Sequence, residues 1–302
     1  MSVIDKEDFD PETIFISADV ACRIARNDNG NTYVVYGKAR KEDKDDSSIK
    51  AQLENVFIKN RVKPYFQHIV KVSDVKSLIR KDNLYTTRMN LIGKNGSEIA
   101  AEEYMPILQD TNKLNTLDRW VIQFCINRLI EEYSRNAIDT ALFMTLTSSS
   151  YSDKNLLKWF EKLIDDTDFP DIGYSLVIEI DVKKFLTYQS EAEALIIQLR
   201  KKHGISTALL HVPNCSILEQ CMKHMHFEYT RLSPTFGDNK MSAMEMKEII
   251  AIAHENNSLV IADKLETGES LAAAIDAGVD YVSGYIIQPT QEQIETEESM
   301  EI

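Results

Sequence analysis

The feature that most constrains the fold is a regular alternation of short β-rich runs with amphipathic helical stretches, which separate the runs from the second one onward. The β-rich runs are Tyr65–Val72, Leu84–Ile92, Ala141–Thr147, Ser175–Asp181, Ile205–Val212, Tyr229–Ser233, Leu259–Asp263 and Tyr281–Ile287. Eight strands with interleaved helices is the count of a closed, TIM-like (β/α)8 barrel in the α/β class. An open doubly wound sheet is the alternative, but no glycine-rich phosphate loop supports it.

One connection departs from a regular barrel. Only the eleven residues Ser73–Asn83 join the first run to the second. A parallel crossover needs about a dozen residues or more. The spacing therefore predicts a first strand that is antiparallel to its neighbour.

The clearest break in the chain is Arg40–Lys50, a stretch of charged residues and serines that is typical of a linker. Before it, Ile16–Arg26 has helical spacing and Thr32–Tyr36 is β-rich, which predicts a short helix–strand appendage. We therefore expect an appendage and linker over residues 1–45, a barrel over 46–292 and an acidic, disordered tail over 293–302.

Charge and hydropathy exclude several classes of function. The net charge is −14, from 48 acidic and 34 basic residues. This argues against DNA binding, because DNA binding needs lysine and arginine side chains to neutralise the phosphates. No apolar run is long enough to span a membrane. The acidic amino terminus lacks the apolar region of a secretory signal. The four cysteines show no CxxC spacing and are expected to be reduced thiols. These features predict a cytoplasmic protein.

Several segments together resemble EAL domains, the cyclic di-GMP phosphodiesterase family. Pro64–Val70 is similar to the opening strand of that family, and Leu117–Ile122 is similar to its long helix. Leu265–Thr267, Ala277–Tyr285 and Pro289 resemble its final segment. The resemblance runs from about residue 51 to 292, and the family barrel also has an antiparallel first strand. The appendage resembles the end of a GGDEF domain but lacks the loop of a cyclase.

The resemblance also implies that the catalytic chemistry has been lost. Phosphodiester hydrolysis in this family needs divalent cations held by a ring of oxygen ligands. The positions where the family has those ligands or their lysine carry other residues here: Thr86, Thr145, Val182, Leu210, His211, Arg231 and Ser233. Glu179 and Glu266 remain of the acidic set. We therefore expect a degenerate domain with no metal, no cofactor and no catalysis.

Ligand binding needs fewer groups than hydrolysis. By resemblance, Gln67, Asp118 and Glu266 would contact guanine, while Leu265 and Pro289 would pack on a base. An alternative role for Gln67 is to satisfy backbone groups at the strand end. Glu266 alternatively caps the helix that follows it.

The phosphate contact is altered in the same comparison. Asn90 stands where the family has an arginine. Arg88 lies two residues away, so it projects to the same face of the strand and is expected to replace that donor. Arg88 alternatively pairs with Glu102 or Glu103. Glu179 completes the predicted ligand-binding set.

Among divergent relatives, the chain most resembles the FimX-type EAL domains, especially over Leu84–Ile99, where Gly93–Ile99 is expected to form a turn. The resemblance implies a metal-free cyclic di-GMP receptor that reports to a PilZ-type protein in type IV pilus or motility control. A homodimer is compatible with it. The alternatives are a protein-interaction module that has lost the ligand and a residual phosphodiesterase.

Overall fold

The computed structural model describes residues 49–53, 55–75, 83–136, 140–167, 176–232 and 241–294. These residues belong to one compact unit that begins at Ser47. The predicted appendage over residues 1–45 and most of the predicted acidic tail lie outside the described residues.

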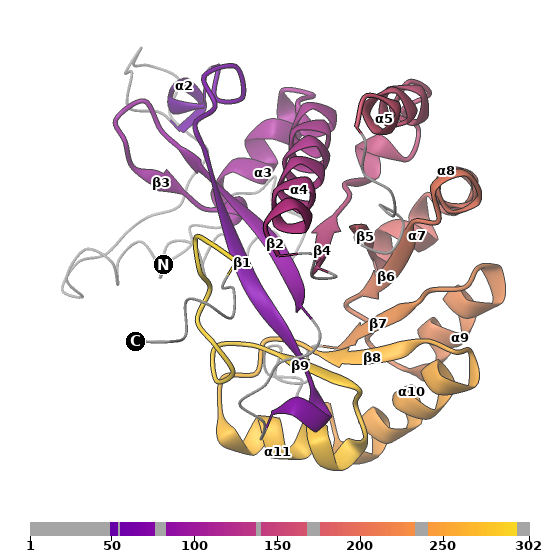
Figure 1. Cartoon of the computed structure of the whole chain (residues 1–302). Coiled ribbons are helices and arrows are strands. Elements are labelled where there is room, and N and C mark those ends of the chain that lie inside the picture. The colour runs from indigo at the N-terminus through magenta and orange to yellow at the C-terminus, as the bar shows by residue number, and fades with distance from the viewer. Residues whose placement is uncertain are drawn as a thin grey trace, which may run out of the picture. The chain divides into compact units, whose positions relative to one another are not determined.

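Eight strands form a closed barrel in which β1 pairs with both β2 and β9 (Figure 1). The strands are β1 (Val62–Lys71), β2 (Asn83–Ile92), β4 (Thr140–Thr145), β5 (Leu176–Asp181), β6 (Ser206–Leu210), β7 (Tyr229–Leu232), β8 (Leu259–Ala262) and β9 (Tyr281–Ser283). From β2 through β4 to β9 each strand is parallel to the next around the barrel. The predicted TIM-like barrel is therefore confirmed.

The first strand runs antiparallel to both of its neighbours, as the short connection predicts. It pairs with β2 from Val62↔Leu91 to Ile69↔Leu84, but with β9 only over Ile69–Lys71. Its first half therefore extends beyond β9 and forms a two-stranded rim with β2. Phe66 bridges to Gln291, so the chain segment after β9 lies along the other edge of this rim.

Helices surround the barrel on its outer side (Figure 1). They are α2 (Ile49–Gln52), α3 (Ala101–Asp110), α4 (Leu114–Asn136), α5 (Leu156–Asp165), α7 (Val182–Thr187), α8 (Gln189–His203), α9 (Cys215–His224), α10 (Ala243–Glu255) and α11 (Gly268–Ala277). Short 3-10 turns cover Val72–Asp74 and Ser148–Ser150. Ser242 caps α10 in a reciprocal capping box with Glu245.

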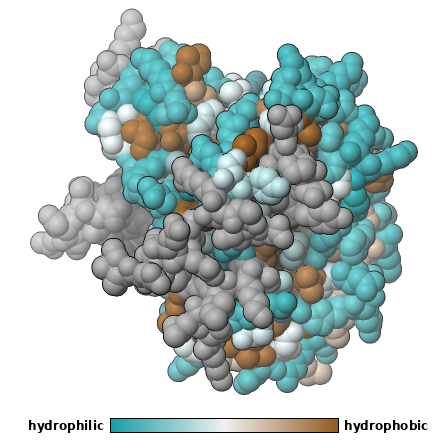
Figure 2. All heavy atoms as spheres, in the orientation of Figure 1, coloured by the Kyte–Doolittle hydropathy of each residue, from teal (hydrophilic) through white to brown (hydrophobic). Residues whose placement is uncertain are grey.

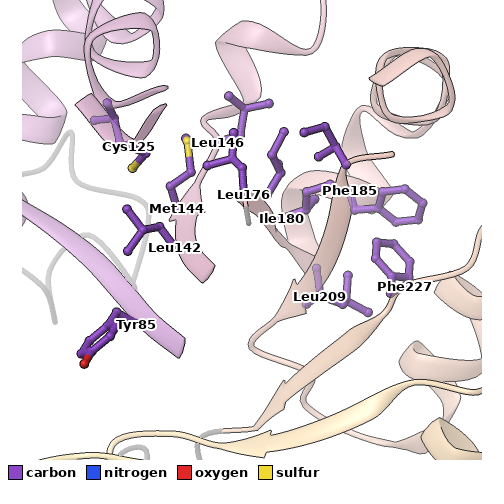
Figure 3. Packing of buried hydrophobic residues seen from close by; sticks show 14 of the residues in the cluster. Tyr85, Cys125, Leu142, Met144, Leu146, Leu176, Ile180, Phe185, Leu209 and Phe227 are labelled. Atoms are coloured by element: carbon purple, nitrogen blue, oxygen red, sulfur yellow. The ribbon is translucent and has the colours of Figure 1, made fainter. Parts of the chain in front are cut away.

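Apolar side chains form two separate clusters. The smaller cluster lies inside the barrel, on the side away from the mouth where the parallel strands end. It contains Ile69, Leu84, Ala141, Phe143, Val177, Ala208, Ile261 and Tyr281. The larger one lies between the strands and the outer helices. In Figure 3, Phe185 of α7 faces Phe227, which lies in the loop between α9 and β7. Their rings are arranged edge to face, with ring centroids 5.4 Å apart. On the face shown in Figure 2, the described surface is mostly hydrophilic, with small scattered apolar patches.

Several strand boundaries differ from the prediction; β1, for example, begins at Val62 and not at Tyr65, and β4 ends at Thr145 and not at Thr147. The last strand ends at Ser283 and not at Ile287, because Gly284 turns the chain with a φ of +146°. The predicted turn after β2 contains one further element, since Glu98–Ile99 forms β3 and pairs back on Leu91 and Ile92. The pattern of apolar and polar residues does not specify where Gly284 turns the chain, or that Glu98 and Ile99 pair with β2.

None of the helices in the described ranges is long and apolar enough to cross a membrane.

The close approach of Gly284 to the end of β8 gives a test of the barrel closure. A Cβ atom at Gly284 would lie 2.3 Å from the backbone nitrogen and oxygen of Leu265, whereas one at Gly268 would meet nothing within 4 Å. Gly284→Ala is therefore expected to lower the free energy of unfolding by about 2 kcal/mol or more, from strain and displaced backbone. Gly268→Ala, in the first turn of α11, should be neutral or stabilising. Urea unfolding of the two variants checks this, and equal stabilities would contradict it.

Candidate functional site

The predicted site residues come from several strands and collect at one end of the barrel, where the parallel strands end. The register of β1 against β2 places Gln67 opposite Thr86 and Tyr65 opposite Arg88. Lys63 lies opposite Asn90 in the same way. Residues two apart on a strand share a face, so these three pairs form a ladder that rises from the barrel interior onto the rim. The predicted alignment of Arg88 with Asn90 on one face agrees with this register.

A buried arginine lies at the centre of the barrel mouth. The side chain of Arg231, on β7, is about 3% exposed and forms ion pairs with Glu179 of β5 and Asp263 after β8. Its Nη2 atom lies 2.9 Å from Oδ2 of Asp263. Its Nη1 atom also donates to Thr86 Oγ1 of β2 at 2.8 Å. One guanidinium thus joins four strands across the barrel.

Neighbouring side chains complete this polar layer. Thr145 at the end of β4 donates to the second carboxylate oxygen of Glu179 at 3.0 Å. The guanidinium of Arg231 lies 5.9 Å from the ring centre of Phe143, which belongs to the apolar cluster below. Burial alone lowers the pKa of Arg231, but the charges of Glu179 and Asp263 outweigh it and raise the pKa above its ordinary value. The arginine is therefore a permanent cation.

These residues do not fit a divalent cation. A hard cation needs several oxygen ligands that converge on one point. In the described ranges, no group of three histidine, cysteine, aspartate or glutamate side chains is close enough to hold a metal ion. Glu179 and Asp263 instead both face the guanidinium of Arg231. A metal ion between them would compete with a fixed positive charge.

Asp118, near the start of α4, has an internal role. Its Oδ2 atom accepts hydrogen bonds from the backbone and hydroxyl of Thr147, at 3.1 and 2.6 Å, and from the hydroxyl of Ser150, at 2.6 Å. The residue is 1% exposed. Burial raises the pKa of Asp118 to about 6, although these hydrogen bonds favour the ionised form. The carboxylate therefore anchors the loop after β4 to α4.

Two further predicted residues are also engaged within the protein. The Gln67 amide donates to the backbone oxygen of Gln288, and to that of Gly284 at 3.4 Å, which is the backbone role named as its alternative. Leu265 is fully buried in the outer apolar cluster. Its backbone N–H donates to the carbonyl oxygen of Ser283, and its carbonyl oxygen accepts from the N–H of Ile286. These hydrogen bonds join the segment after β8 to the end of β9 and the segment that follows it. In this arrangement Leu265 presents no surface to a base.

The remaining predicted residues are accessible or partly accessible. Arg88, Glu266 and Pro289 are exposed, and Asn90 is half-buried. Asn90 Nδ2 donates to Glu98 Oε2 at 3.1 Å. Thr267, and not Glu266, provides the side-chain cap of α11. Glu266 therefore stays available to a ligand at the mouth.

Glu98 on β3 organises the top of the rim. Its carboxylate accepts hydrogen bonds from Lys63 at 2.7 Å and from Tyr65 at 2.7 Å, in addition to Asn90. The hydrogen bonds from Lys63, Tyr65 and Asn90 lower the pKa of Glu98 to about 2. Lys63 also pairs with Glu292 at 2.7 Å. The rim lysine is therefore neutralised by two acids of the chain itself.

Three residues at the mouth, His211, Lys264 and Arg231, were not among the site residues predicted from the sequence. His211 follows β6 and its Nδ1 lies 2.9 Å from Oδ2 of Asp181. Burial opposes ionisation of Asp181, but hydrogen bonds from His211 and from the backbone of Lys184 and Lys183 outweigh it and lower its pKa. Lys264 follows β8 between two buried residues. A signal was present for Arg231, because an arginine in an apolar strand must find buried acids.

Lys264 experiences several charges at the mouth. Burial lowers its pKa, the negative charges of Asp263 and Glu102 oppose this, and the positive charges of Arg88 and Arg231 reinforce it. Two further cations, Arg88 and Arg231, therefore lie within electrostatic range of the Lys264 ammonium.

The fold and the mouth residues define an EAL-type barrel, and comparison with known families agrees. The family model described as EAL domain matches residues 50–290. This chain belongs to the EAL domain family.

Individual relatives are distant. The FimX EAL domain of Pseudomonas aeruginosa bound to c-di-GMP is 23% identical, with a TM-score of 0.71 over 82% of this chain and 98% of that one. The FimX EAL domain of Xanthomonas citri in complex with c-di-GMP is 21% identical, with a TM-score of 0.70 over 82% and 94%. Cyclic di-GMP phosphodiesterase PdeF of Escherichia coli K12 is 19% identical over 249 residues, which cover 80% of this chain. The chain spans about a third of the length of the curated relatives it matches.

The ion-pair network predicts a large stability loss when its cation is removed. Arg231→Met would leave two buried carboxylates without a counter-charge, which typically costs about 3–5 kcal/mol. Thr86→Val, the control, removes one hydrogen bond and should cost about 1 kcal/mol. Adding Glu179→Gln and Asp263→Asn to Arg231→Met should restore part of the loss. Urea unfolding at neutral pH measures all three, and an Arg231→Met variant as stable as the control would refute the network.

The raised pKa of Asp118 predicts a pH-dependent term in stability. A carboxyl group whose pKa rises from 3.8 to about 6 on folding stabilises the protein below the lower value. That stability is lost as the pH rises through the folded pKa. Between pH 4 and pH 7 the wild type should therefore lose on the order of 2 kcal/mol relative to Asp118→Asn. Urea unfolding of both proteins across this pH range measures the difference. A difference in unfolding free energy that does not change with pH would contradict the prediction.

Proposed function

We propose that this EAL domain is a non-catalytic receptor for cyclic di-GMP. The observation that carries the proposal is the buried guanidinium of Arg231, which lies between Glu179 and Asp263. A phosphodiesterase of this kind needs cations that polarise the phosphate and lower the pKa of an attacking water. Replacing oxygen ligands by one arginine supplies charge without an open coordination position for that water.

The rim supports a role in ligand binding. Arg88 and Glu266 are exposed at the mouth, and they offer a cation for a phosphate and an acceptor for a guanine edge. Pro289 is exposed, and it follows Gln288, whose backbone oxygen accepts a hydrogen bond from Gln67 at the mouth. The FimX EAL domains of similar fold are described as bound to c-di-GMP. We propose the same ligand here, held above the Arg231 layer and not inside it.

The output of such a receptor is contact with another protein. We propose that ligand binding changes the rim surface formed by β1, β2 and β3, which a regulatory protein of the PilZ type then reads. The partner class and a connection to type IV pilus or motility control come from the resemblance to FimX-type domains. The prediction that the protein acts in the cytoplasm belongs to the same proposal.

A second candidate is a protein-interaction module that no longer binds the nucleotide. Leu265 is fully buried, and the Gln67 amide bonds to backbone oxygens. Both observations favour this candidate, because the two side chains would have to move to meet guanine.

Calorimetry with cyclic di-GMP in EDTA separates the candidates. A receptor should release heat with a micromolar dissociation constant, and a module without ligand should give no heat at millimolar nucleotide. The same protein with Mg²⁺ or Mn²⁺ should leave the nucleotide intact over many hours when the products are separated by chromatography. Metal-dependent hydrolysis would refute the non-catalytic assignment.

Arg88 gives a residue-level test of the receptor. Arg88→Ala should weaken binding by tenfold to a hundredfold, because an arginine–phosphate hydrogen bond contributes about 1.5–3 kcal/mol. Lys247→Ala, which removes one exposed positive charge from α10, is the matched control and should bind as the wild type does. Equal affinities of both variants would exclude Arg88 as the phosphate donor.

A further inference from the structure

The backbone at the barrel mouth is unusual at Lys264. Among the described residues, six non-glycine residues have a positive φ, and four of them are asparagines. The other two are His211, at +59°, and Lys264, at +57°. His211 directly follows β6 and Lys264 is the second residue after β8, so both lie at the mouth.

A lysine is a poor choice for this conformation. Asparagine and histidine are enriched in the left-handed region, because a short polar side chain or ring can bond locally, whereas lysine has no such preference. Glycine would adopt this backbone without strain. Strained backbone that persists is a reason to look for a functional role of the side chain. The conformation of Lys264 therefore indicates that its side chain is retained for a purpose other than folding.

The flanking residues hold this backbone in place. Asp263 contacts Arg231 on one side, and Leu265 is fully buried on the other, where it packs against Gly284. Both neighbours have fixed positions, so the Cα of Lys264 cannot move away from the mouth. The lysine is thus held by rigid elements, as binding residues commonly are.

The surrounding charges give the side chain a function. Lys264 is half-buried and lies within electrostatic range of Arg88 and Arg231. Arg231 is neutralised by Glu179 and Asp263, whereas no ion pair among those recorded for the described residues engages Arg88. Asp263 and Thr86 both contact Arg231. Lys264 follows Asp263, and Arg88 lies two residues beyond Thr86, so both cations flank one buried guanidinium, where a bound anion would meet two positive charges.

We propose that Lys264 is a phosphate-binding residue, and that it acts together with Arg88 on the same anionic phosphodiester group. This proposal rests on the proposed receptor function and adds a donor that the family resemblance did not name. The two cations come from β2 and from the end of β8, on opposite sides of β1 and β9 in the closed barrel. A phosphate bound by both cations would link ligand binding to the position of Arg88 on the rim.

The test uses three substitutions of Lys264 in the same calorimetric titration in EDTA. Lys264→Met should weaken cyclic di-GMP binding at least tenfold, and it should also reduce the dependence of affinity on salt. Lys264→Arg keeps the charge and should retain most of the affinity. Lys247→Met, on the outer face of α10, is the control and should leave binding unchanged.

Lys264→Gly distinguishes a binding role from a structural one. Because glycine adopts a positive φ without strain, this variant should have a higher Tm than the wild type, together with weakened binding. A purely structural lysine would instead give a lower Tm, and that result would overturn the proposal. Unchanged affinity of Lys264→Met beside a wild type that binds would refute the role of Lys264 alone. A wild type that gives no heat would refute this inference and the receptor function together.

Discussion

The barrel depends on how it accommodates one buried positive charge. Arg231 lies at the centre of the mouth with almost no exposure, and a cation there is tolerated only with nearby acids and hydrogen-bond acceptors. Glu179, Asp263 and Thr86 meet that requirement from three different strands. The same contacts therefore neutralise the charge and tie together strands that are far apart in the sequence. The contacts that stabilise the mouth also leave Glu179 and Asp263 facing a cation of the protein itself.

This polar layer divides the barrel interior in two. Below it, apolar side chains such as Ile69 and Val177 fill the interior. The next inward-facing position is polar on every strand except β6, for example Gln67 and Glu179. The polar layer is closed by internal bonds. A ligand at the mouth consequently meets the rim formed by the extended half of β1 with β2, where charged side chains are exposed, and not the barrel interior.

Residue type alone does not decide the role of a site residue. Asp118 is of the type that could bind guanine, yet its carboxylate anchors the loop after β4. Gln67 bonds to backbone oxygens of the chain after β9. Asn90 is held by Glu98. At each of these positions the protein itself supplies a partner, so a nucleotide would compete with an existing hydrogen bond.

The sequence by itself determined the barrel, because the alternation of strands and helices is a local pattern, and the antiparallel first strand, because the length of Ser73–Asn83 limits the connection. The expectation that the family's oxygen ligands are replaced also comes from the sequence, since it depends on residue types at fixed places in the chain. Only the tertiary structure decided which partner each polar side chain takes. The pairing of Arg231 with Glu179, the burial of Leu265 and the strained backbone of Lys264 all arise where distant strand ends converge. Local sequence patterns do not determine which residues from distant strands come into contact there.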